Sequence, residues 1–485
     1  MAADTNSPAD PPNPEPALDI DRHLKYWKMC LQSPLPHHYL SNEGNRTALA
    51  YFIINSIVIL TPNSNNNTES PLITPQDRRK LRQWVLSHQH PGGGFSPSSS
   101  LVFPLQGYEQ WGPETGSQNA ESAGLANAPG TLFALQLLAL LADKDDPDGA
   151  FNGVDRVQTL RWLRRLQRED GSFGEVLRLL PGQGWFIGGG YDMRYCYIAA
   201  SIRWMLRGDV KEGEPGWVED FDTEKLANYI LSSQTYDGGF AGSSQEEPHA
   251  GYAYCAISAL SLLDRPLTTT TTNPPPTSPL LSRIRDLPAL THWLTSRQFI
   301  YLTPSPPSPT DSDPSPDDND ETEDVNFLLP SLSSLSLSPP SSQHPLVASN
   351  GRTNKVADTC YTWWVLAALS NLSQLPLFGD WLPARRFLLE KMAHRIGGFS
   401  KYPGGPPDVY HSCFGLTVMS LMGEPGLRKL DGGLAVPEET VKVIERARGK
   451  LLKKARTEGK GREVVVLGVM MRGARPGWLG AVGVN

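Results

Sequence analysis

The chain contains 485 residues, carries a formal net charge of −7 and is 39% apolar, with 43 prolines. The apolar fraction suits a globular core, whereas the prolines indicate long segments outside helix and strand interiors. The acidic balance excludes the basic surface expected of a protein that binds nucleic acid, and no apolar run approaches the roughly 18 residues of a membrane span. Five dispersed cysteines and an amino terminus without secretion-signal features predict a cytoplasmic protein with free thiols.

Low-complexity segments divide the chain. Residues 1–18 are rich in Asp and Pro and are expected to form a disordered tail. Residues 268–279, rich in Thr and Pro, and residues 303–347, rich in Pro, Ser and acidic side chains, cannot bury enough apolar area to offset the entropy lost on folding. We therefore expect one folded domain over residues 19–445 that carries these two disordered insertions, followed by a C-terminal extension over residues 446–485.

A glycine-rich turn that ends in phenylalanine recurs along this domain. Such self-similarity is typical of stacked supersecondary units. A fifth, interrupted copy begins at Gln298 and resumes at Asn350, which would place the 303–347 insertion inside one turn of the repeat. The uninterrupted copies end at Phe95, Phe173, Phe240 and Phe399, and three of them follow a glutamine, at Gln89, Gln167 and Gln234.

Apolar segments with the length and period of helices follow these turns, and amphipathic segments precede them. About six such helix pairs predict an all-α fold, an α/α barrel in the form of a toroid. Because the inner helices would run parallel, their amino termini, with unpaired N–H groups and a partial positive charge, would meet at one mouth. The predicted inner helices are Thr131–Ala142, Met193–Leu206, Tyr252–Leu263, Cys360–Leu372 and Ser412–Met422, and the predicted outer helices include Thr159–Arg168 and Thr223–Ser233.

Three residues at this mouth predict a metal site. Asp358 and Cys360 lie two residues apart at the start of one inner helix, and His411 lies at the start of the next. One carboxylate, one thiolate and one imidazole suit Zn²⁺ better than Mg²⁺ or Ca²⁺, and three protein ligands leave a fourth position for substrate. The alternative makes Cys360 a buried core thiol, Asp358 a helix cap and His411 a hydrogen-bonded rim residue.

Cationic and phenolic side chains occupy the same predicted mouth. Donors of this kind beside helix amino termini suit a phosphate or diphosphate group. An open zinc position would hold a substrate thiol as the thiolate, while the donors stabilise the oxygens of a leaving group. Taken singly, each of these residues could instead be a solvated loop charge or an edge of the core. The residues are Arg194, His249, Arg352, Lys355 and Tyr361.

Four motifs together resemble the β subunits of the protein prenyltransferases: Glu-Pro-His249-Ala-Gly-Tyr, Gly-Arg352-Thr-Asn-Lys355-Val-Ala-Asp358-Thr-Cys360-Tyr361, Gly-Gly-Phe-Ser-Lys401 and Asp-Val-Tyr-His411. The resemblance covers most of residues 20–265 and 280–445. It implies an α/α barrel that pairs with a helical-repeat α subunit and transfers an isoprenoid from its diphosphate to a protein cysteine. By matching positions it implies zinc on Asp358, Cys360 and His411, diphosphate on His249, Arg352, Lys355, Tyr361 and Lys401, and an isoprenoid channel at Ala48, Arg194, Tyr197, Cys255 and Trp364.

The resemblance also bears on the type of enzyme. Lys401 stands where farnesyl- and Rab geranylgeranyl-transferases have an aspartate, which in farnesyltransferase serves Mg²⁺, whereas the type I geranylgeranyl enzyme has lysine. The resemblance thus implies catalytic roles for Lys401, Tyr361 and His249, with Mg²⁺ not required. Ala48 matches a small residue that leaves room for a fourth isoprene unit. The implied substrates are geranylgeranyl diphosphate and CaaX-ending proteins such as small GTPases.

Departures and alternatives remain. Tyr410 replaces a leucine of the type I pattern, Asn127 stands where a histidine reads the peptide carboxylate, and Gly190 replaces a glutamate, so selection of the last peptide residue stays open. Farnesyltransferase and Rab geranylgeranyltransferase are alternatives within the family. A terpene cyclase is another, because residues 143–146 (Asp-Lys-Asp-Asp) match an acid motif, although a solvated turn also explains it. The third alternative is a non-catalytic helical-repeat adaptor.

Overall fold

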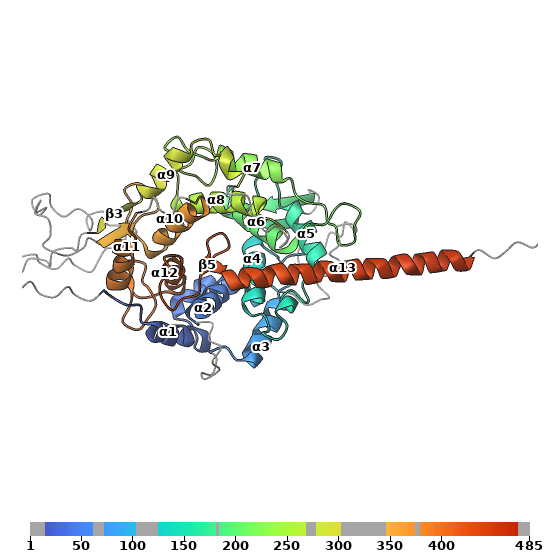
Figure 1. The fold of residues 1–485 in the computed structure, drawn as a ribbon, viewed down its shortest axis with the longest axis horizontal. Coiled ribbons are helices and arrows are strands. Elements are labelled where there is room, and N and C mark those ends of the chain that lie inside the picture. The colour runs from blue at the N-terminus through green and yellow to red at the C-terminus, as the bar shows by residue number, and fades with distance from the viewer. Residues whose placement is uncertain are drawn as a thin grey trace, which may run out of the picture.

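The computed structural model describes residues 15–61, 72–102, 125–180, 184–267, 278–301, 346–373 and 379–473. Within these ranges, inner helices form a closed ring in which each contacts the next and α12 contacts α2 (Figure 1). The ring confirms the predicted α/α barrel. In order, the inner helices are α2 (Arg46–Leu60), α4 (Ala128–Leu140), α6 (Met193–Leu206), α8 (Ala250–Asp264), α10 (Thr359–Asn371) and α12 (Val409–Leu421).

An outer layer surrounds this ring. Five inner helices were predicted from the sequence to within three residues at either end, whereas α2 was not among them. The described helices include none that is long and apolar enough to cross a membrane. The outer helices are α1 (Ile20–Gln32), α3 (Pro75–Leu86), α5 (Arg156–Arg165), α7 (Thr223–Ser232), α9 (Leu287–Thr295) and α11 (Leu382–Phe387), the last continued by a π-helical turn over Leu388–Met392.

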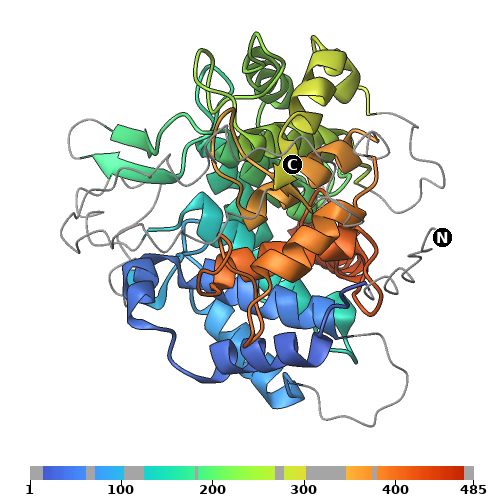
Figure 2. The same ribbon diagram turned by 90° about the vertical axis from the view of Figure 1, so that its left-hand side faces the viewer.

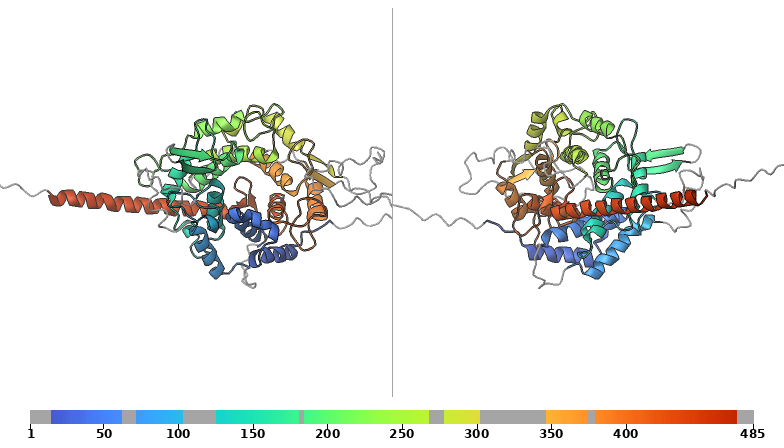
Figure 3. Two further views of the ribbon diagram at one scale, coloured as in Figure 1. Left: turned by 180° about the vertical axis from the view of Figure 1, so that it is seen from behind. Right: turned by 45° about the vertical axis from the view of Figure 1, so that its right-hand side comes forward.

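In addition to its two layers of helices, the structure contains short β-hairpins and one long C-terminal helix. The strands pair antiparallel as β1 with β2, β3 with β4, and β5 with β6. They are β1 (Val176–Leu180), β2 (Gly184–Gly188), β3 (Gln298–Tyr301), β4 (Leu346–Ser349), β5 (Leu430–Asp431) and β6 (Val436–Pro437), and the C-terminal helix is α13 (Glu438–Gly473). Helix α13 is continuous across residue 446 and projects well beyond the barrel (Figure 3).

The repeat glutamines connect each helix pair to the next. The Gln167 amide donates to the Asp222 carbonyl (2.8 Å), and the Asp222 amide donates to Gln167 Oε1 (2.8 Å). Gln234 makes the same two bonds with Asp286. Because Asp222 and Asp286 are the N-caps of α7 and α9, each glutamine fixes where the following outer helix begins.

Glycines in the repeat turns allow close contact between each turn and a neighbouring outer helix. At Gly171 φ is +93°, and a Cβ there would lie 2.2 Å from the Lys225 carbonyl oxygen in α7. At Gly397, in the last turn, a Cβ would lie 2.4 Å from the Arg22 carbonyl oxygen in α1. The last turn therefore packs against the first outer helix, which closes the ring.

The interrupted fifth turn keeps the same geometry. Gln234 bridges Phe240 in an uninterrupted turn, and Gln298 pairs with Ser349 at the base of the β3–β4 hairpin. The two segments that flank the long insertion are therefore joined in the same way as the two ends of an uninterrupted turn. Most of the predicted disordered segments, namely residues 1–14, 268–277 and 303–345, lie outside the described residues.

The end of the barrel opposite the mouth is closed by residues 430–437, which we call the floor segment. Its backbone carbonyls accept hydrogen bonds from inner-helix side chains: Tyr51 donates to Ala435 (2.7 Å) and Gln136 to Leu434 (2.8 Å). Arg448 of α13 donates to the Trp204 carbonyl at the end of α6. Cationic donors thus satisfy helix carboxyl ends here, where carbonyls point outward.

Replacing Gly171 with alanine should destabilise the chain by about 2–5 kcal/mol, because it adds a positive-φ penalty and a clash with the Lys225 carbonyl. Gly213→Ala is the matched control: its φ is +81°, but a Cβ would meet nothing within 4 Å, so we expect about 1–2 kcal/mol. Urea denaturation of the full chain measures both. Equal losses in the two variants would contradict the role given to the Gly171 contact.

Candidate metal centre and anion site

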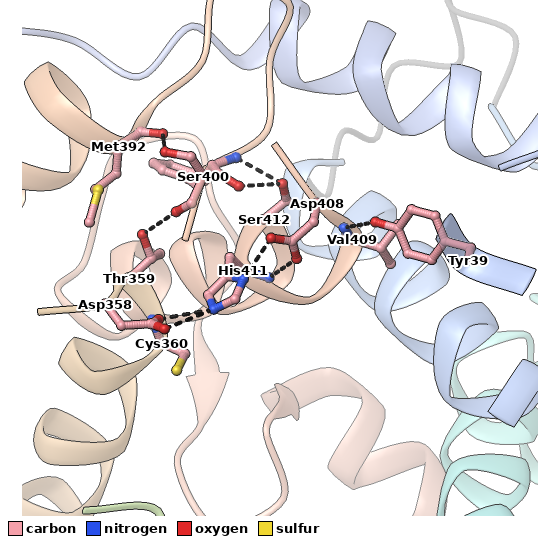
Figure 4. Close-up of polar contacts among 11 residues, drawn as sticks. Tyr39, Asp358, Thr359, Cys360, Met392, Ser400, Asp408, Val409, His411 and Ser412 are labelled. Carbon is pink, nitrogen blue, oxygen red and sulfur yellow. Dashed lines mark hydrogen bonds and ion pairs between the residues drawn. The ribbon is translucent and has the colours of Figure 1, made fainter. Parts of the chain in front are cut away.

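Asp358, Cys360 and His411 converge between the starts of α10 and α12 (Figure 4). All three are buried, and their potential ligand atoms lie within 4.8 Å of one another. His411 Nε2 lies 3.0 and 3.1 Å from the two carboxylate oxygens of Asp358. The predicted metal set is therefore assembled from two neighbouring inner helices.

Each member of this cluster is held by a helix cap. Asp358 is the N-cap of α10, where its Oδ1 accepts the Cys360 amide (2.8 Å). Asp408 is the N-cap of α12 and accepts the His411 amide on Oδ1 (2.8 Å), while its Oδ2 lies 2.6 Å from His411 Nδ1. A carboxylate behind the second ring nitrogen fixes the orientation of a metal-binding histidine.

The electrostatics of the cluster favour a cation. Burial alone would lower the pKa of His411, but hydrogen bonds to Asp358 and Asp408 outweigh it and raise the pKa to about 9. Burial and the neighbouring Asp358 charge raise the pKa of the Cys360 thiol well above its usual value. A divalent ion would replace both protons and neutralise the carboxylate, so the donor set fits zinc.

His249 and Tyr361 form the centre of the anion group. His249 is the N-cap of α8: its Nδ1 accepts the Gly251 amide (2.9 Å), and its Nε2 lies 3.3 Å from the Tyr361 hydroxyl. Burial, followed by the charge of Arg352, lowers the pKa of His249 to about 4. The imidazole is therefore neutral at pH 7. Since Nδ1 accepts, its proton is on Nε2, facing Tyr361.

Gly351 leaves room for Tyr361. A Cβ at Gly351 would lie 2.0 Å from Tyr361 Cε1, and the Gly351 carbonyl accepts the Ala250 amide (2.9 Å) at the start of α8. The backbone at this glycine thus positions Tyr361 beside His249.

The predicted cations of the anion group differ in their surroundings. Arg352 Nη1 lies 3.1 Å from Glu247 Oε2, and Arg352 Nε is buried with no hydrogen-bond partner among the described residues. Lys355 and Lys401 are exposed, and the Lys401 carbonyl accepts the Thr359 amide (3.4 Å) beside the start of α10. Arg194 is paired with its own helix cap, Asp192. Arg352 and Arg194 lie close enough to His249 to act on it electrostatically, although the charge of Arg194 is already matched by Asp192. Lys355 and Lys401 stay predicted members of this group.

The predicted channel residues lie on four inner helices. Tyr197 of α6 and Cys255 of α8 are buried, whereas Ala48 of α2 and Trp364 of α10 are partly exposed. The Trp364 ring lies 4.6 Å from that of Phe414. The structure adds an aromatic cluster that sequence reasoning missed, formed by Phe52, Phe133 and Phe414.

Helical periodicity could not single out this cluster, because α2 and α4 are apolar on nearly every side. The structure marks the cluster by partial exposure, because Phe52 and Phe133 remain partly exposed on inner helices that are mostly buried. Aromatic side chains left open on inner helices suit an apolar ligand inside the ring.

The acid motif at residues 143–146 follows the carboxyl end of α4, away from the mouth. Lys450 of α13 lies 2.8 Å from Asp146 of the motif, and Arg446 of α13 lies 3.3 Å from Asp148, two residues beyond it. The motif therefore contributes one ion pair to the packing of α13, which favours the solvated-turn interpretation over a cyclase acid.

Comparison with known proteins agrees with this geometry. Residues 18–436 match the family model described as the prenyltransferase alpha-alpha toroid domain. The β subunit of geranylgeranyl transferase type-1 from Arabidopsis thaliana is 30% identical, over 89% of this chain and 92% of its own length. The farnesyltransferase β subunit from Pyricularia oryzae is 24% identical, over 84% of this chain and 63% of its own.

A solved structure shows the same fold. It is that of Candida albicans protein geranylgeranyltransferase-I complexed with GGPP, with a TM-score of 0.63 and 22% identity over 89% of this chain and 99% of that one. These matches confirm the resemblance carried by the four sequence motifs. The chain belongs to the prenyltransferase α/α-toroid family of enzymes, beside the β subunits of the protein prenyltransferases.

Proposed function

We propose that the chain is the catalytic β subunit of a cytoplasmic, zinc-dependent protein geranylgeranyltransferase type I. With an α subunit, it would transfer geranylgeranyl from its diphosphate to the cysteine thiol of CaaX-ending proteins. The observation that carries the proposal is the convergence, at one mouth, of the Asp358–Cys360–His411 set with the His249–Tyr361 pair and its surrounding cations. A thiol site and a diphosphate site side by side match the two substrates of thiol alkylation.

Asp358, Cys360 and His411 would hold the zinc. Zinc bound there would stabilise the substrate thiol as a thiolate at neutral pH. The thiolate sulfur would form the new C–S bond at the first carbon of the isoprenoid. The C–O bond to the diphosphate would break at the same carbon, and the diphosphate would leave with the electron pair.

The anion group would stabilise that leaving group. His249 Nε2–H can donate to the Tyr361 hydroxyl, which leaves the phenolic O–H to donate to a phosphate oxygen. Arg352, whose Nε has no partner in the described structure, would donate from its guanidinium, and Lys355 and Lys401 would add charge. Donors aimed at oxygens that gain charge act mainly on the transition state.

Two residues support the type I assignment. Lys401 would supply at the diphosphate the positive charge that other members of the family obtain from Mg²⁺. Ala48, as a small side chain, would leave room in the isoprenoid channel for the fourth isoprene unit. Tyr410 favours farnesyltransferase as the alternative, because a tyrosine just before the metal-binding histidine resembles the farnesyl pattern. Its ring packs edge-to-face on Phe52 (5.5 Å) and Phe414 (4.7 Å). Competition between farnesyl and geranylgeranyl diphosphate, with peptides ending in Leu or Ser, tests whether the enzyme is a type I geranylgeranyltransferase or a farnesyltransferase.

Cys360→Ala should reduce the zinc content of the purified heterodimer at least about tenfold and abolish transfer, while binding of the isoprenoid diphosphate is retained. Cys413→Ala is the matched control, because Cys413 is also a buried thiol, on helix α12, but lies outside the metal set. Metal analysis and diphosphate binding are measured together. Full zinc content in Cys360→Ala would contradict the ligand assignment.

The wild-type heterodimer should remain active in EDTA-treated buffer supplemented with zinc alone, and Lys401→Asp should create a dependence on added Mg²⁺. The physical reason is that the substitution removes a cation and supplies a carboxylate that Mg²⁺ can bind. Lys28→Asp, on the exposed side of α1, controls for the change in net charge. A strict Mg²⁺ requirement in the wild type would exclude the proposed role of Lys401.

Gly351→Ala should lower kcat/KM by about 10- to 100-fold, because the new methyl group displaces the Tyr361 ring from His249. Gly44→Ala, where a Cβ meets nothing within 4 Å, should have no effect. Steady-state kinetics with varied isoprenoid diphosphate measure the change. Unaltered kinetics would mean that Tyr361 does not act on the diphosphate.

A further inference from the structure

Two arginines at the mouth of the barrel are each paired with a carboxylate. The mouth is the end from which the β1–β2 hairpin projects (Figure 2), since β1 begins beside Asn127, the N-cap of α4. Arg194 pairs with Asp192 at the start of α6, and Arg352 pairs with Glu247, which lies two residues before the N-cap of α8. A diphosphate that enters this mouth must therefore compete with a carboxylate for either cation.

The two pairs differ in strength. Arg194 donates from Nε to both Asp192 oxygens (3.0 and 2.9 Å) and from Nη2 to Oδ2 (2.5 Å), and the Asp192 side chain is only 13% exposed. The described contact between Arg352 and Glu247 is one hydrogen bond from Nη1 to Oε2 (3.1 Å), and the Glu247 side chain is 56% exposed. An exposed ion pair with one contact is weak, whereas a bidentate pair is stronger. The Arg352–Glu247 pair is therefore the one that an incoming anion can open.

Arg352 has donors that the Glu247 contact does not use. Its Nε is buried and has no hydrogen-bond partner among the described residues. A guanidinium offers donors on all three nitrogens, and a buried donor without an acceptor is unfavourable. The surroundings of Arg352 therefore suit a ligand with several oxygens better than they suit the single Glu247 oxygen.

The backbone on both sides holds this pair together. Gln245, two residues before Glu247, has φ +74°, and Asn354, two residues after Arg352, has φ +59°. Such left-handed conformations are uncommon outside glycine and concentrate at functional sites. Pro248 follows Glu247 directly and restricts its backbone to extended conformations. Two constrained loops thus set the carboxylate opposite the guanidinium.

Glu247 also acts on the centre of the anion group. Burial, followed by the charge of Arg352, lowers the pKa of His249 to about 4, and the charge of Glu247 opposes that shift. A carboxylate close enough to act on His249 is close enough to repel a diphosphate bound beside it. The same side chain can therefore hold Arg352 and oppose the ligand that Arg352 would bind.

We propose that Glu247 is an exchangeable counter-anion for Arg352. Its carboxylate holds the guanidinium until a diphosphate binds and displaces it. After isoprenoid transfer, the released carboxylate competes for Arg352 again and speeds the departure of inorganic diphosphate. Glu247 is thus a positioning residue that acts on the reaction through Arg352. The inference rests on the proposed function, since that function places a diphosphate at this mouth.

The test measures binding of inorganic diphosphate to the heterodimer by isothermal titration calorimetry at low ionic strength, where exposed charges are least screened. Glu247→Gln keeps the shape of the side chain and removes its charge, so affinity should rise about three- to tenfold, whereas loss of a merely structural role would lower it. Glu246→Gln is the matched control, because it removes the same charge from a carboxylate that accepts the Ser243 amide (3.2 Å), and should change affinity less than about twofold.

A second background separates exchange from simple repulsion. In Arg352→Gln heterodimer, the additional Glu247→Gln substitution should change affinity less than about twofold, since no guanidinium remains to be released. An equal gain with and without Arg352 would show that the carboxylate acts by repulsion alone, and overturns the inference.

Unchanged or weaker binding of inorganic diphosphate by Glu247→Gln also overturns the inference. The proposed function fails separately: wild-type heterodimer that transfers no isoprenoid to a CaaX peptide overturns that function and this inference with it. Transfer by the wild type, together with no gain of affinity in Glu247→Gln, overturns the inference alone.

Discussion

Parallel packing of the inner helices brings their amino termini to one mouth, where every first turn has N–H groups that need acceptors. The residues that accept these bonds are also the residues of the site. Asp358 uses one oxygen to cap α10 and directs its carboxylate at His411; Asp408 caps α12 and holds His411 Nδ1; His249 caps α8 through Nδ1 and keeps Nε2 for Tyr361. Each side chain therefore has one structural bond and one functional contact, and the caps fix the functional atoms without further supporting residues.

The parallel alignment of the inner helices also makes the two ends of the barrel chemically different. Carboxyl ends of the inner helices gather opposite the mouth, and there the chain supplies donors: Arg156 to the Leu206 carbonyl and Arg448 to the Trp204 carbonyl. The floor segment is held in the same way, since Tyr51 and Gln136 donate to its carbonyls. One end is thus closed by cations and amides that satisfy carbonyls. The other is open, with helix N–H groups and cations suited to an anion.

Much of the fold could be predicted because the residues that connect one helix pair to the next belong to short turns that recur in the sequence. The turn that ends at Phe173 needs a positive-φ glycine and a glutamine for the next helix cap, and both are visible in the sequence. Helix α2 was missed because no such turn precedes it. The metal set was predictable since Asp358 and Cys360 begin a helix, whereas Phe52 and Phe133 were not, because an all-apolar helix does not reveal which face lines a lumen. The β1–β2 hairpin was also missed, although Pro-Gly-Gln-Gly at 181–184 between apolar runs is a hairpin signal.

The β3–β4 hairpin has a consequence for how such barrels diversify. Its base, Gln298 opposite Ser349, reproduces the bridge that closes an ordinary repeat turn. A turn whose two ends are already joined can lengthen at its tip while the joint between helix pairs is kept, and the entropic cost grows only with the logarithm of the added length. Each repeat turn is therefore a position at which evolution can graft new sequence without redesigning the core, and recognition elements can be gained or lost there independently of the chemistry.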